Sequence, residues 1–442
     1  MWFTPSLRTM APLPLLAAAL PSALVPAIVQ PAGVQARGSE PELRVLLQEG
    51  PSLEIGATTT PLRLSDGRGR MLLELPPGSG VRLSAAGAVL RAEPLAGAVG
   101  QGSRSFPLTE LWVEPLATAP RAEPQSQDAA PAFLLQQKSY RGRLQLLRGN
   151  ARLQAINVIG IESYLPSVVG SEMPASWPLE ALRAQAVAAR TYALRQRKPA
   201  APFDLTATVA SQVYKGLAAE TPSTREAVAS TRSQVLLHGN TLINAVFHSS
   251  GGGITENSGD LWSRQLPYLV SVPDYDDSSP VREWQVRLEP EKLRQAFPET
   301  GGVQRIEVLG TTASGRVRQA RVTGPSGSLL VSGPDLRTRL GLRSTLVRFE
   351  LLQPELASLP LPPPPSPLGV PGEGREAPPL MPAIPAMPLQ VPQPALLAIG
   401  RGFGHGVGMS QWGAYTMARQ GSSYDQILRH YYQGAEVRPL PR

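Results

Sequence analysis

The sequence predicts an α+β fold with mostly antiparallel sheets, a central alanine-rich helix, a β-rich N-terminal module and a proline-rich disordered insert. Three observations lead to this prediction. Short apolar segments that alternate with polar residues recur from residue 42 to 116, separated by Gly and Pro, as in strands joined by turns. Residues 178–194 carry apolar side chains at helical spacing and are rich in alanine. Residues 359–395 are dominated by proline, which prevents a packed element.

The first 36 residues have the pattern of a secretory signal peptide. Arg8 precedes an apolar stretch, and Val34-Gln35-Ala36 has the small-residue form of a cleavage site. Prolines interrupt the apolar stretch, which disfavours a stable transmembrane helix. An uncleaved N-terminal anchor is the alternative, and only then would the membrane be a partner. In both cases we expect the body of the protein to be secreted, in the periplasm or in the cell wall.

The remaining chain divides by changes in composition. The β-rich module carries no candidate chemistry, so wall binding, docking and a scaffold role all stay open for it. The segment that follows it is polar and proline-containing, as in a linker. The expected order is a signal peptide at 1–36, the β-rich module at 40–116, the linker at 117–137, a catalytic core at 138–358, the proline-rich insert at 359–395 and the C-terminal part of the core at 396–442.

Glu172 precedes the central helix and is the first candidate for chemistry. Pro178 suits the first helical turn, Ser176 is a plausible cap, and we expect Glu172 on a constrained turn just before them. Its apolar neighbours Met173 and Trp177 would raise its pKa, as a general acid requires. A nearby helix N-terminus would lower the pKa instead. The other interpretation is a carboxylate that only caps the helix.

A second candidate follows a predicted strand and reads His248-Ser249-Ser250-Gly251-Gly252. No nucleophile elbow precedes this Ser/His pair, and adjacent residues on a strand face opposite sides, so a serine hydrolase is disfavoured. We expect the glycines to let backbone amides approach a sugar or the Glu172 loop, with both serines donating hydrogen bonds.

Two further features could complete this site. Glu256 and Asp260 follow in the same loop, and either could be a second carboxylate. Later in the chain, four glycines from residue 402 to 408 alternate with larger residues, which include His405. The lysine and spacing of a phosphate loop are missing. Glycines at every second position instead indicate a close approach of a neighbouring element or a glycan ring. His405 is as consistent with a structural histidine as with a residue of the cleft.

The composition favours some classes of binding partner over others. The chain has 42 Lys and Arg against 34 Asp and Glu, a net charge of +8, which favours an anionic partner. The basic residues are scattered and not interleaved with aromatic residues, which argues against a nucleic-acid site. Cysteine is absent, so disulfides and thiolate metal sites are excluded.

Three blocks together resemble the family of the stage II sporulation protein D and the amidase enhancers, which are bacterial cell-wall factors. The blocks are Ser171-Glu172-Met173-Pro174, residues 247–258 and residues 401–414. The resemblance implies that Glu172 is the catalytic glutamate, because it occupies that place in the sporulation members, which are lytic transglycosylases. Members of the family often carry Cys and His ligands for zinc after the central helix. Residues 203–216 contain neither, so we expect no metal and no cofactor.

The resemblance implies one of two functions, both outside the cytoplasm. The first is cleavage of peptidoglycan glycan strands, in which one glutamate acts as acid and then as base and leaves 1,6-anhydro-muramyl ends. The second is a non-catalytic wall-binding protein that enhances an N-acetylmuramoyl-L-alanine amidase. The expected partners are therefore glycan strands and, in the second case, an amidase, with no nucleic acid. Besides Glu172, the expected substrate-binding residues are Ser249, Ser250, Gly251, Gly252, His405, Gly406, Ser410 and Gln411.

Overall fold

The computed structural model describes residues 40–95, 102–116, 131–262, 264–352 and 395–441. The chain divides into two units, Met1–Ser39 and Glu40–Arg442, and the first lies entirely outside the described residues. The expected signal peptide, most of the expected linker and the proline-rich insert up to residue 394 are therefore outside them as well. In the second unit the predicted α+β class with mostly antiparallel sheets is confirmed.

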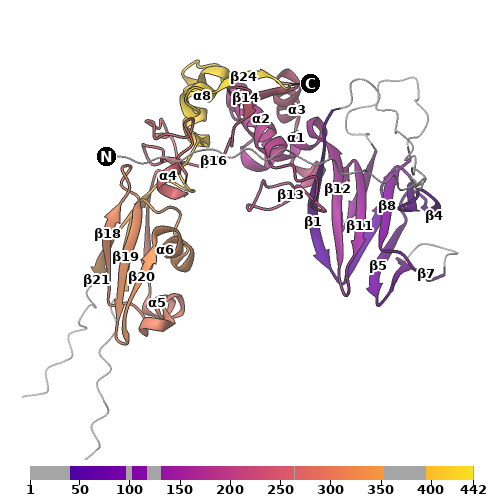
Figure 1. Ribbon diagram of the computed structural model, residues 1–442, viewed down its shortest axis with the longest axis horizontal. Coiled ribbons are helices and arrows are strands. Elements are labelled where there is room, and N and C mark those ends of the chain that lie inside the picture. The colour runs from indigo at the N-terminus through magenta and orange to yellow at the C-terminus, as the bar shows by residue number, and fades with distance from the viewer. Residues whose placement is uncertain (1–39, 96–101, 117–130, 263, 353–394, 442) are drawn as a thin grey trace, which may run out of the picture. The chain divides into compact units, whose positions relative to one another are not determined.

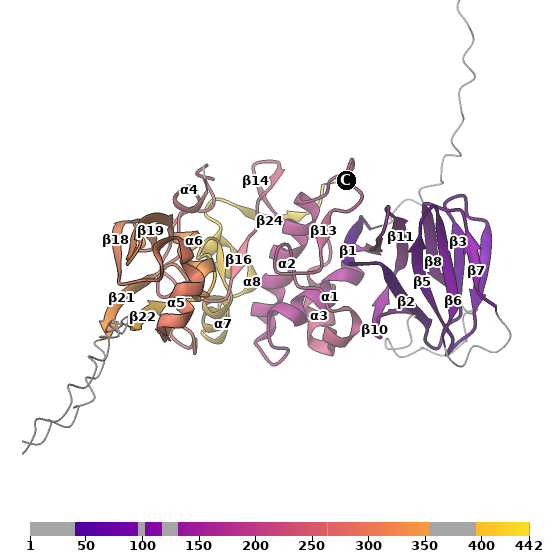
Figure 2. The ribbon, with the colours of Figure 1, turned by 90° about the horizontal axis from the view of Figure 1, so that it is seen from below.

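The N-terminal part is built from two large sheets whose buried faces contribute to one core (Figures 1 and 2). Apolar residues alternate with polar ones along each strand, so Leu43 and Val45 face this core, as do Leu144 and Leu146 on a strand of the same sheet. The seven-stranded sheet has the order β13 (Leu205–Thr206), β1 (Glu42–Gly50), β12 (Leu153–Gly160), β11 (Arg143–Arg148), β8 (Glu110–Pro115), β3 (Leu62–Asp66) and β4 (Met71–Leu75). The six-stranded sheet has the order β10 (Lys138–Arg141), β9 (Ala132–Leu135), β2 (Ser52–Ala57), β5 (Gly80–Ala86), β6 (Val89–Pro94) and β7 (Arg104–Phe106).

Both sheets combine strands from either side of the expected linker. Strand β9 falls inside the range 117–137 that the sequence analysis assigned to a linker. It pairs with β10 in a hairpin whose turn consists of Gln136 and Gln137, both with positive φ. Such turns usually contain Gly, Asn or Asp, so the two glutamines gave no turn signal in the sequence.

Helix α2 (Leu179–Arg195) is the centre of the next part of the chain, as its alanine content predicts. Its small side chains are fully buried, including Ala184, Ala188 and Ala193, because neighbouring elements pack against several of its sides. Ser176 does not cap it: Pro178 is the N-cap residue and no side chain caps this end. The elements around α2 are α1 (Ile161–Glu172), α3 (Pro222–Ser230), α7 (Gln411–Arg419), α8 (Tyr424–Tyr431), β14 (Gln234–His238) and β15 (Thr241–Leu242).

Helix α1 was not predicted from the sequence. It contains Pro166 and Gly170, two residues that disfavour a helix interior. Tertiary packing outweighs this preference, since Tyr164, Leu165 and Val169 are all buried. A side chain at Gly170 would overlap the carbonyl oxygen of Ala219, so the glycine permits close packing on the neighbouring segment.

The third part has its own hydrophobic core, which includes Trp284, Phe297 and Val322. Strands β21 (Val347–Leu352) and β22 (Ala395–Arg401) flank the residues that the structure does not describe, and they pair antiparallel with each other. The expected insert therefore lies between two neighbouring strands, and Ala395, its last expected residue, already belongs to β22. The other elements here are β17 (Glu283–Leu288), α5 (Pro290–Ala296), β18 (Arg305–Thr311), β19 (Val317–Gly324), β20 (Gly327–Ser332) and α6 (Gly333–Leu340).

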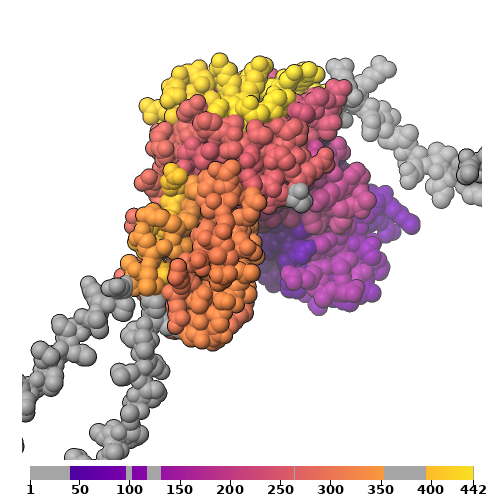
Figure 3. All heavy atoms as spheres, turned by 60° about the vertical axis from the view of Figure 1, so that its left-hand side comes forward, coloured from indigo at the N-terminus to yellow at the C-terminus, as the bar shows by residue number. Residues whose placement is uncertain are grey.

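Strands near the C-terminus pair with strands from the middle of the sequence. Strand β24 (Glu436–Pro439) pairs with β14, and the short strand β23 (Met409–Ser410) pairs in parallel with β16 (Phe247–His248). Figure 3 shows the yellow C-terminal segment lying against the pink and coral segments from the middle of the chain. Among the described residues, no helix combines the length and the apolar character needed to span a membrane.

Candidate active site

Glu172 is the last residue of α1. Met173 is extended (φ −130°, ψ 144°) and ends the helix, and Pro174 follows. The sequence analysis expected Glu172 on a turn before a helix N-terminus, and this was wrong because residues 161–172 are helical. The difference matters for charge: the C-terminal end of a helix disfavours a carboxylate, whereas an N-terminus would stabilise it.

Burial raises the pKa of the Glu172 carboxyl above its ordinary value of 4.5. Three groups oppose this effect without cancelling it. The backbone N–H of Val213 donates to Oε1 at 3.2 Å, the side-chain amide of Gln411 donates to Oε2 at 3.3 Å, and the positive charge of Lys215 also favours the carboxylate. The carboxyl therefore keeps its proton to a higher pH than a solvated glutamate does. Once it is ionised, hydrogen bonds from these two donors stabilise the carboxylate.

A cavity of about 410 Å³ opens beside this carboxyl. Its lining comes from segments that are distant in sequence, and Glu172 is the one carboxylate among the described residues that line it. The lining residues are Glu172, Tyr192, Val209, Ala210, Ser211, Val213, Val246, Phe247, His248, Ser249, Trp262, Phe403, Gly404, His405 and Gln411.

Three of the expected substrate-binding residues lie at this cavity with Glu172: Ser249, His405 and Gln411. The parallel pairing of β16 with β23 brings them together, because it aligns His248 with Ser410 and so sets the two loops side by side. Gln411 begins α7, which directs its amide toward the end of α1.

The residues Ser250, Gly251 and Gly252 are not among those that line the cavity. Their polar groups are already bound to two buried aspartates. The hydroxyl of Ser250 donates to Asp276, the N–H of Gly252 donates to the same oxygen at 2.7 Å, and the N–H of Gly251 donates to Asp274 at 2.8 Å. These hydrogen bonds hold the loop in place and occupy the three polar groups.

Gly406 and Ser410 also lie outside the cavity lining. A side chain at Gly406 would overlap the buried guanidinium of Arg316, so the glycine lets the loop rest directly on that group. Ser410 is fully buried and caps α7, since its hydroxyl accepts the N–H of Gly413 at 3.2 Å. Its contribution to the site is therefore indirect, through the placement of Gln411.

The two histidines at the cavity are neutral near pH 7. Burial, with the positive charges of Arg337 and Arg316, lowers the pKa of His405 to about 4. Its Nδ1 accepts the backbone N–H of Val407 at 3.0 Å, which leaves the ring proton on Nε2. Burial also lowers the pKa of His248, whose Nδ1 lies 3.1 Å from the carbonyl oxygen of Val407. Within the described residues its Nε2 has no hydrogen-bond partner, so no Ser–His pair of a hydrolase is formed.

Neither candidate for a second carboxylate lines the Glu172 cavity. Glu256 is buried and accepts hydrogen bonds from the hydroxyls of Thr312 at 2.5 Å and Ser314 at 2.7 Å. Asp260 forms an ion pair with Arg318. Both acids line a neighbouring cavity of about 320 Å³, which shares His405 with the Glu172 cavity. Over the described residues, no group of three or more His, Asp or Glu side chains lies close enough together to hold a metal ion.

The sequence analysis missed several contributors to the cavity. Val213 acts through its backbone N–H, which no side-chain pattern can reveal. Trp262 and Phe403 are aromatic residues with exposed fractions of 37% and 43%. Trp262 follows the block 247–258 and Phe403 lies within the block 401–414, but a single aromatic residue in a loop carries no periodic signal.

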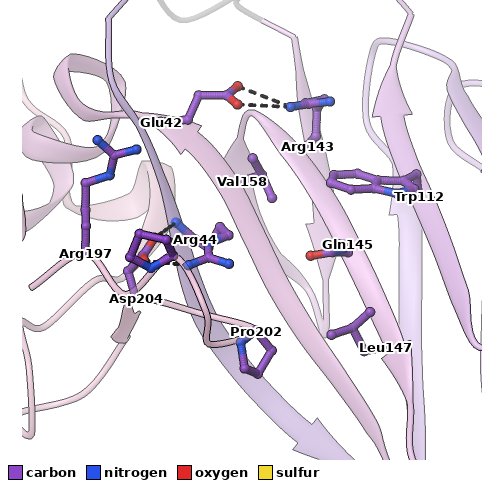
Figure 4. A pocket seen from close by; sticks show the side chains of 11 residues that line it. Glu42, Arg44, Trp112, Arg143, Gln145, Leu147, Val158, Arg197, Pro202 and Asp204 are labelled. Carbon is purple, nitrogen blue, oxygen red and sulfur yellow. Dashed lines mark hydrogen bonds and ion pairs between the residues drawn. The ribbon is translucent and has the colours of Figure 1, made fainter. Parts of the chain in front are cut away.

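A third cavity, of about 440 Å³, lies on the open face of the seven-stranded sheet (Figure 4). Its polar side chains largely pair with one another: Arg44 with Asp204 at 2.7 Å, and Arg143 with Glu42 at 3.2 Å. The ring of Trp112 is covered by Arg143, whose guanidinium carbon lies 5.0 Å from the ring centroid. It shares no lining residue with the Glu172 cavity and offers no unpaired acid or base for chemistry among these groups.

Comparison with known proteins gives consistent matches. Residues 149–238, which include Glu172, match the family described as "Stage II sporulation protein". The chain is 31% identical over 306 residues to the stage II sporulation protein D of Bacillus subtilis (strain 168), covering 64% of this chain and 76% of that protein. It is 31% identical over 313 residues to the protein of the same name from Bacillus amyloliquefaciens, covering 64% and 75%. It is 30% identical over 297 residues to the amidase enhancer of Bacillus subtilis (strain 168), covering 62% of this chain and 40% of that protein.

Proposed function

Because the chain belongs to the stage II sporulation protein D family, we propose that it acts on the bacterial cell wall as a peptidoglycan lytic transglycosylase. The observation that carries the proposal is the environment of Glu172. Its carboxyl is protonated more readily than that of a solvated glutamate and lies at a cavity that no other carboxylate lines among the described residues.

A single carboxyl distinguishes this chemistry from ordinary glycoside hydrolysis. Most glycoside hydrolases use two carboxyl groups, one as acid and one as base or nucleophile. A lytic transglycosylase uses a hydroxyl of the substrate itself as nucleophile, so no water needs to be activated. The intramolecular attack has a large effective concentration, which replaces the help of a second carboxylate.

In the proposed reaction Glu172 first donates its proton to the oxygen that leaves C1 of N-acetylmuramic acid, and the C1–O bond breaks. The resulting carboxylate is stabilised by the N–H of Val213 and the amide of Gln411. It then accepts the proton of the C6 hydroxyl while that oxygen bonds to C1. The products are a 1,6-anhydro-muramyl end and a free hydroxyl on the leaving strand, and Glu172 is protonated again.

The direct test is the substitution Glu172→Gln, with Glu226→Gln as the matched control. Glu226 is an exposed residue of α3 that does not line the cavity. Purified proteins are incubated with intact and with stem-peptide-free glycan strands, and anhydro-muramyl ends are measured by mass spectrometry. We expect Glu172→Gln to lower their formation by roughly 10²–10⁴-fold and the control to match the wild type. Equal product from Glu172→Gln and wild type would refute the assigned role.

The similarity to a protein named amidase enhancer favours a second candidate. In that case the chain binds the wall and stimulates an N-acetylmuramoyl-L-alanine amidase without cleaving glycan itself. The two functions separate in one experiment. If the wild-type protein forms no anhydro ends on either substrate but increases stem-peptide release by an added amidase, the second function replaces the first.

Export is part of both proposals, since glycan strands lie outside the cytoplasm. The signal-like residues 1–36 and the net charge of +8 support it, because an anionic wall would attract the exported protein. N-terminal sequencing of the protein from a secretory host would test it. A first residue at or near 37 is the expected result, and an intact N-terminus on cytoplasmic protein would contradict it.

A further inference from the structure

The mouth of the Glu172 cavity carries exposed apolar side chains. Within the described part of the chain, eight large hydrophobic side chains are exposed, and three of them line this cavity. They are Val209, Trp262 and Phe403, with exposed fractions of 90%, 37% and 43%. Exposed apolar surface gathered at one cavity is unfavourable in water and marks a place where a ligand covers it.

Hydrogen bonds hold the backbone of both aromatic residues in place. Phe403 and Ser250 exchange two backbone hydrogen bonds of 2.8 and 3.1 Å. The flanking Gly402 and Gly404 have φ values of 73° and 114°, a conformation that other residues rarely adopt. Trp262 follows α4 (Ser258–Leu261) and donates its backbone N–H to the carbonyl of Ser258 at 2.8 Å. Two aromatic residues are thus held partly in solvent by a rigid frame, an arrangement that pre-organises a binding surface.

We propose that Trp262 and Phe403 form a stacking subsite for the pyranose rings of a glycan strand. One face of such a ring consists mainly of C–H groups, which carry a small positive charge and pack against the electron-rich face of an aromatic side chain. Hydroxyl groups at the edge of the sugar ring remain solvated or form hydrogen bonds with the polar groups of the cavity. The subsite rests on the proposed function, since it would hold the strand while Glu172 reaches the bond.

The uncharged ring of a sugar fits this surface better than a charged group does. Apart from Glu172, the described residues that line the cavity carry no charged side chain, because both histidines are neutral there. Recognition at the mouth therefore depends on apolar contact and on hydrogen bonds. The N-acetylated pyranose rings of a glycan strand offer both kinds of group along the whole length of the strand.

The test measures binding separately from cleavage. Each variant is made in full-length protein that also carries Glu172→Gln, and its dissociation constant for stem-peptide-free glycan strands is determined by a pull-down titration. We expect Trp262→Ala and Phe403→Ala each to weaken binding about tenfold. Trp262→Tyr, which keeps an aromatic face, should retain most of the affinity. The matched control is Leu330→Ala, because Leu330 is exposed at 55% and does not line this cavity.

The thermal unfolding midpoint of each variant is measured as well, so that a loss of glycan binding can be distinguished from a loss of the folded structure. The proposal is overturned if both alanine variants bind as tightly as their parent, if Leu330→Ala is equally impaired, or if the parent binds no glycan. Its failure is distinct from failure of the proposed function. Suppose that both alanine variants bind glycan normally, and that the wild type forms anhydro ends but Glu172→Gln does not. The stacking subsite is then refuted, whereas the transglycosylase function is supported.

Discussion

The amide of Gln411, at the start of α7, donates a hydrogen bond to the carboxylate of Glu172, at the end of α1, over 239 residues of sequence. This bond connects the two blocks that the sequence analysis linked only through a family resemblance. A donor to a buried carboxylate favours its ionised form. Gln411 therefore sets how readily the proposed acid gives up its proton.

Gln411→Leu removes this donor, and we expect the pKa of Glu172 to rise. The rate of glycan cleavage depends on a protonated Glu172, so the alkaline limb of the pH–rate profile should move to higher pH. The maximal rate should fall roughly tenfold, because the carboxylate formed during the reaction loses a hydrogen bond. The control is Gln420→Leu, an exposed residue next to the other end of α7. An alkaline limb that stays in place or moves to lower pH would contradict the assigned role.

Glu172→Gln should make the protein more stable at pH 7 to 8. The folded protein holds the proton of Glu172 more tightly than the unfolded chain, whose ordinary pKa is 4.5. Stability contributed by this group is thus present below that value and is lost as the pH rises through the raised folded pKa. A neutral glutamine does not suffer this loss. Urea denaturation at pH 4 and pH 8 checks this prediction. The free energies of unfolding of the wild type and Glu172→Gln should be equal at pH 4, and Glu172→Gln should be more stable at pH 8. Glu226→Gln should have the stability of the wild type at both pH values.

Gly406→Ala should destabilise the fold more than Gly421→Ala. Both glycines have positive φ, 85° and 94°, so alanine is strained at either position by about 1–2 kcal/mol. At Gly421 the added methyl group meets nothing within 4 Å, whereas at Gly406 it overlaps the guanidinium of Arg316. We expect a further loss of roughly 1–3 kcal/mol at Gly406. Equal midpoints of urea denaturation for the two variants would show that Arg316 moves aside freely.

The ion pair between Glu162 and Arg190 should be important for stability. Arg190 has a fully buried side chain and donates to both oxygens of Glu162, at 3.0 and 2.6 Å. Glu162→Leu leaves a buried positive charge without its partner, and we expect a cost of about 3–5 kcal/mol in chemical denaturation. The double variant with Arg190→Met should recover part of the loss. The exposed pair of Glu291 and Arg294 supplies the control, where Glu291→Leu should leave the midpoint nearly unchanged.

The sequence predicted those parts of the fold whose pattern is local. The apolar spacing and the alanines identified α2, and alternation between Gly and Pro turns predicted the strands found within residues 42–116. Thr221 and Ser423, residue types that favour N-caps, cap α3 and α8. These features depend on neighbouring residues alone, which is why they can be read from the chain.

The parts of the fold that the sequence did not predict depend on contacts between residues that are distant in the chain. Helix α1 forms against its local preference because its apolar side chains are buried by other elements. The aspartates 274 and 276 bind the loop of Ser250, yet a short acidic stretch in a sequence is more often solvated. The sequence therefore did not indicate that these aspartates would bind the polar groups of the loop. Which hydroxyl and amide groups face a cavity is decided by tertiary structure.

The parallel pairing of β16 with β23 has a consequence for the order of biosynthesis. Glu172 is translated and can be folded into α1 well before Met409 and Ser410 leave the ribosome. A nascent or shortened polypeptide that stops before β23 thus contains the proposed acid without Gln411 and without the glycine-rich wall of its cavity. Under the proposed function, a polypeptide truncated before β23 therefore lacks a complete active site and does not cut the wall.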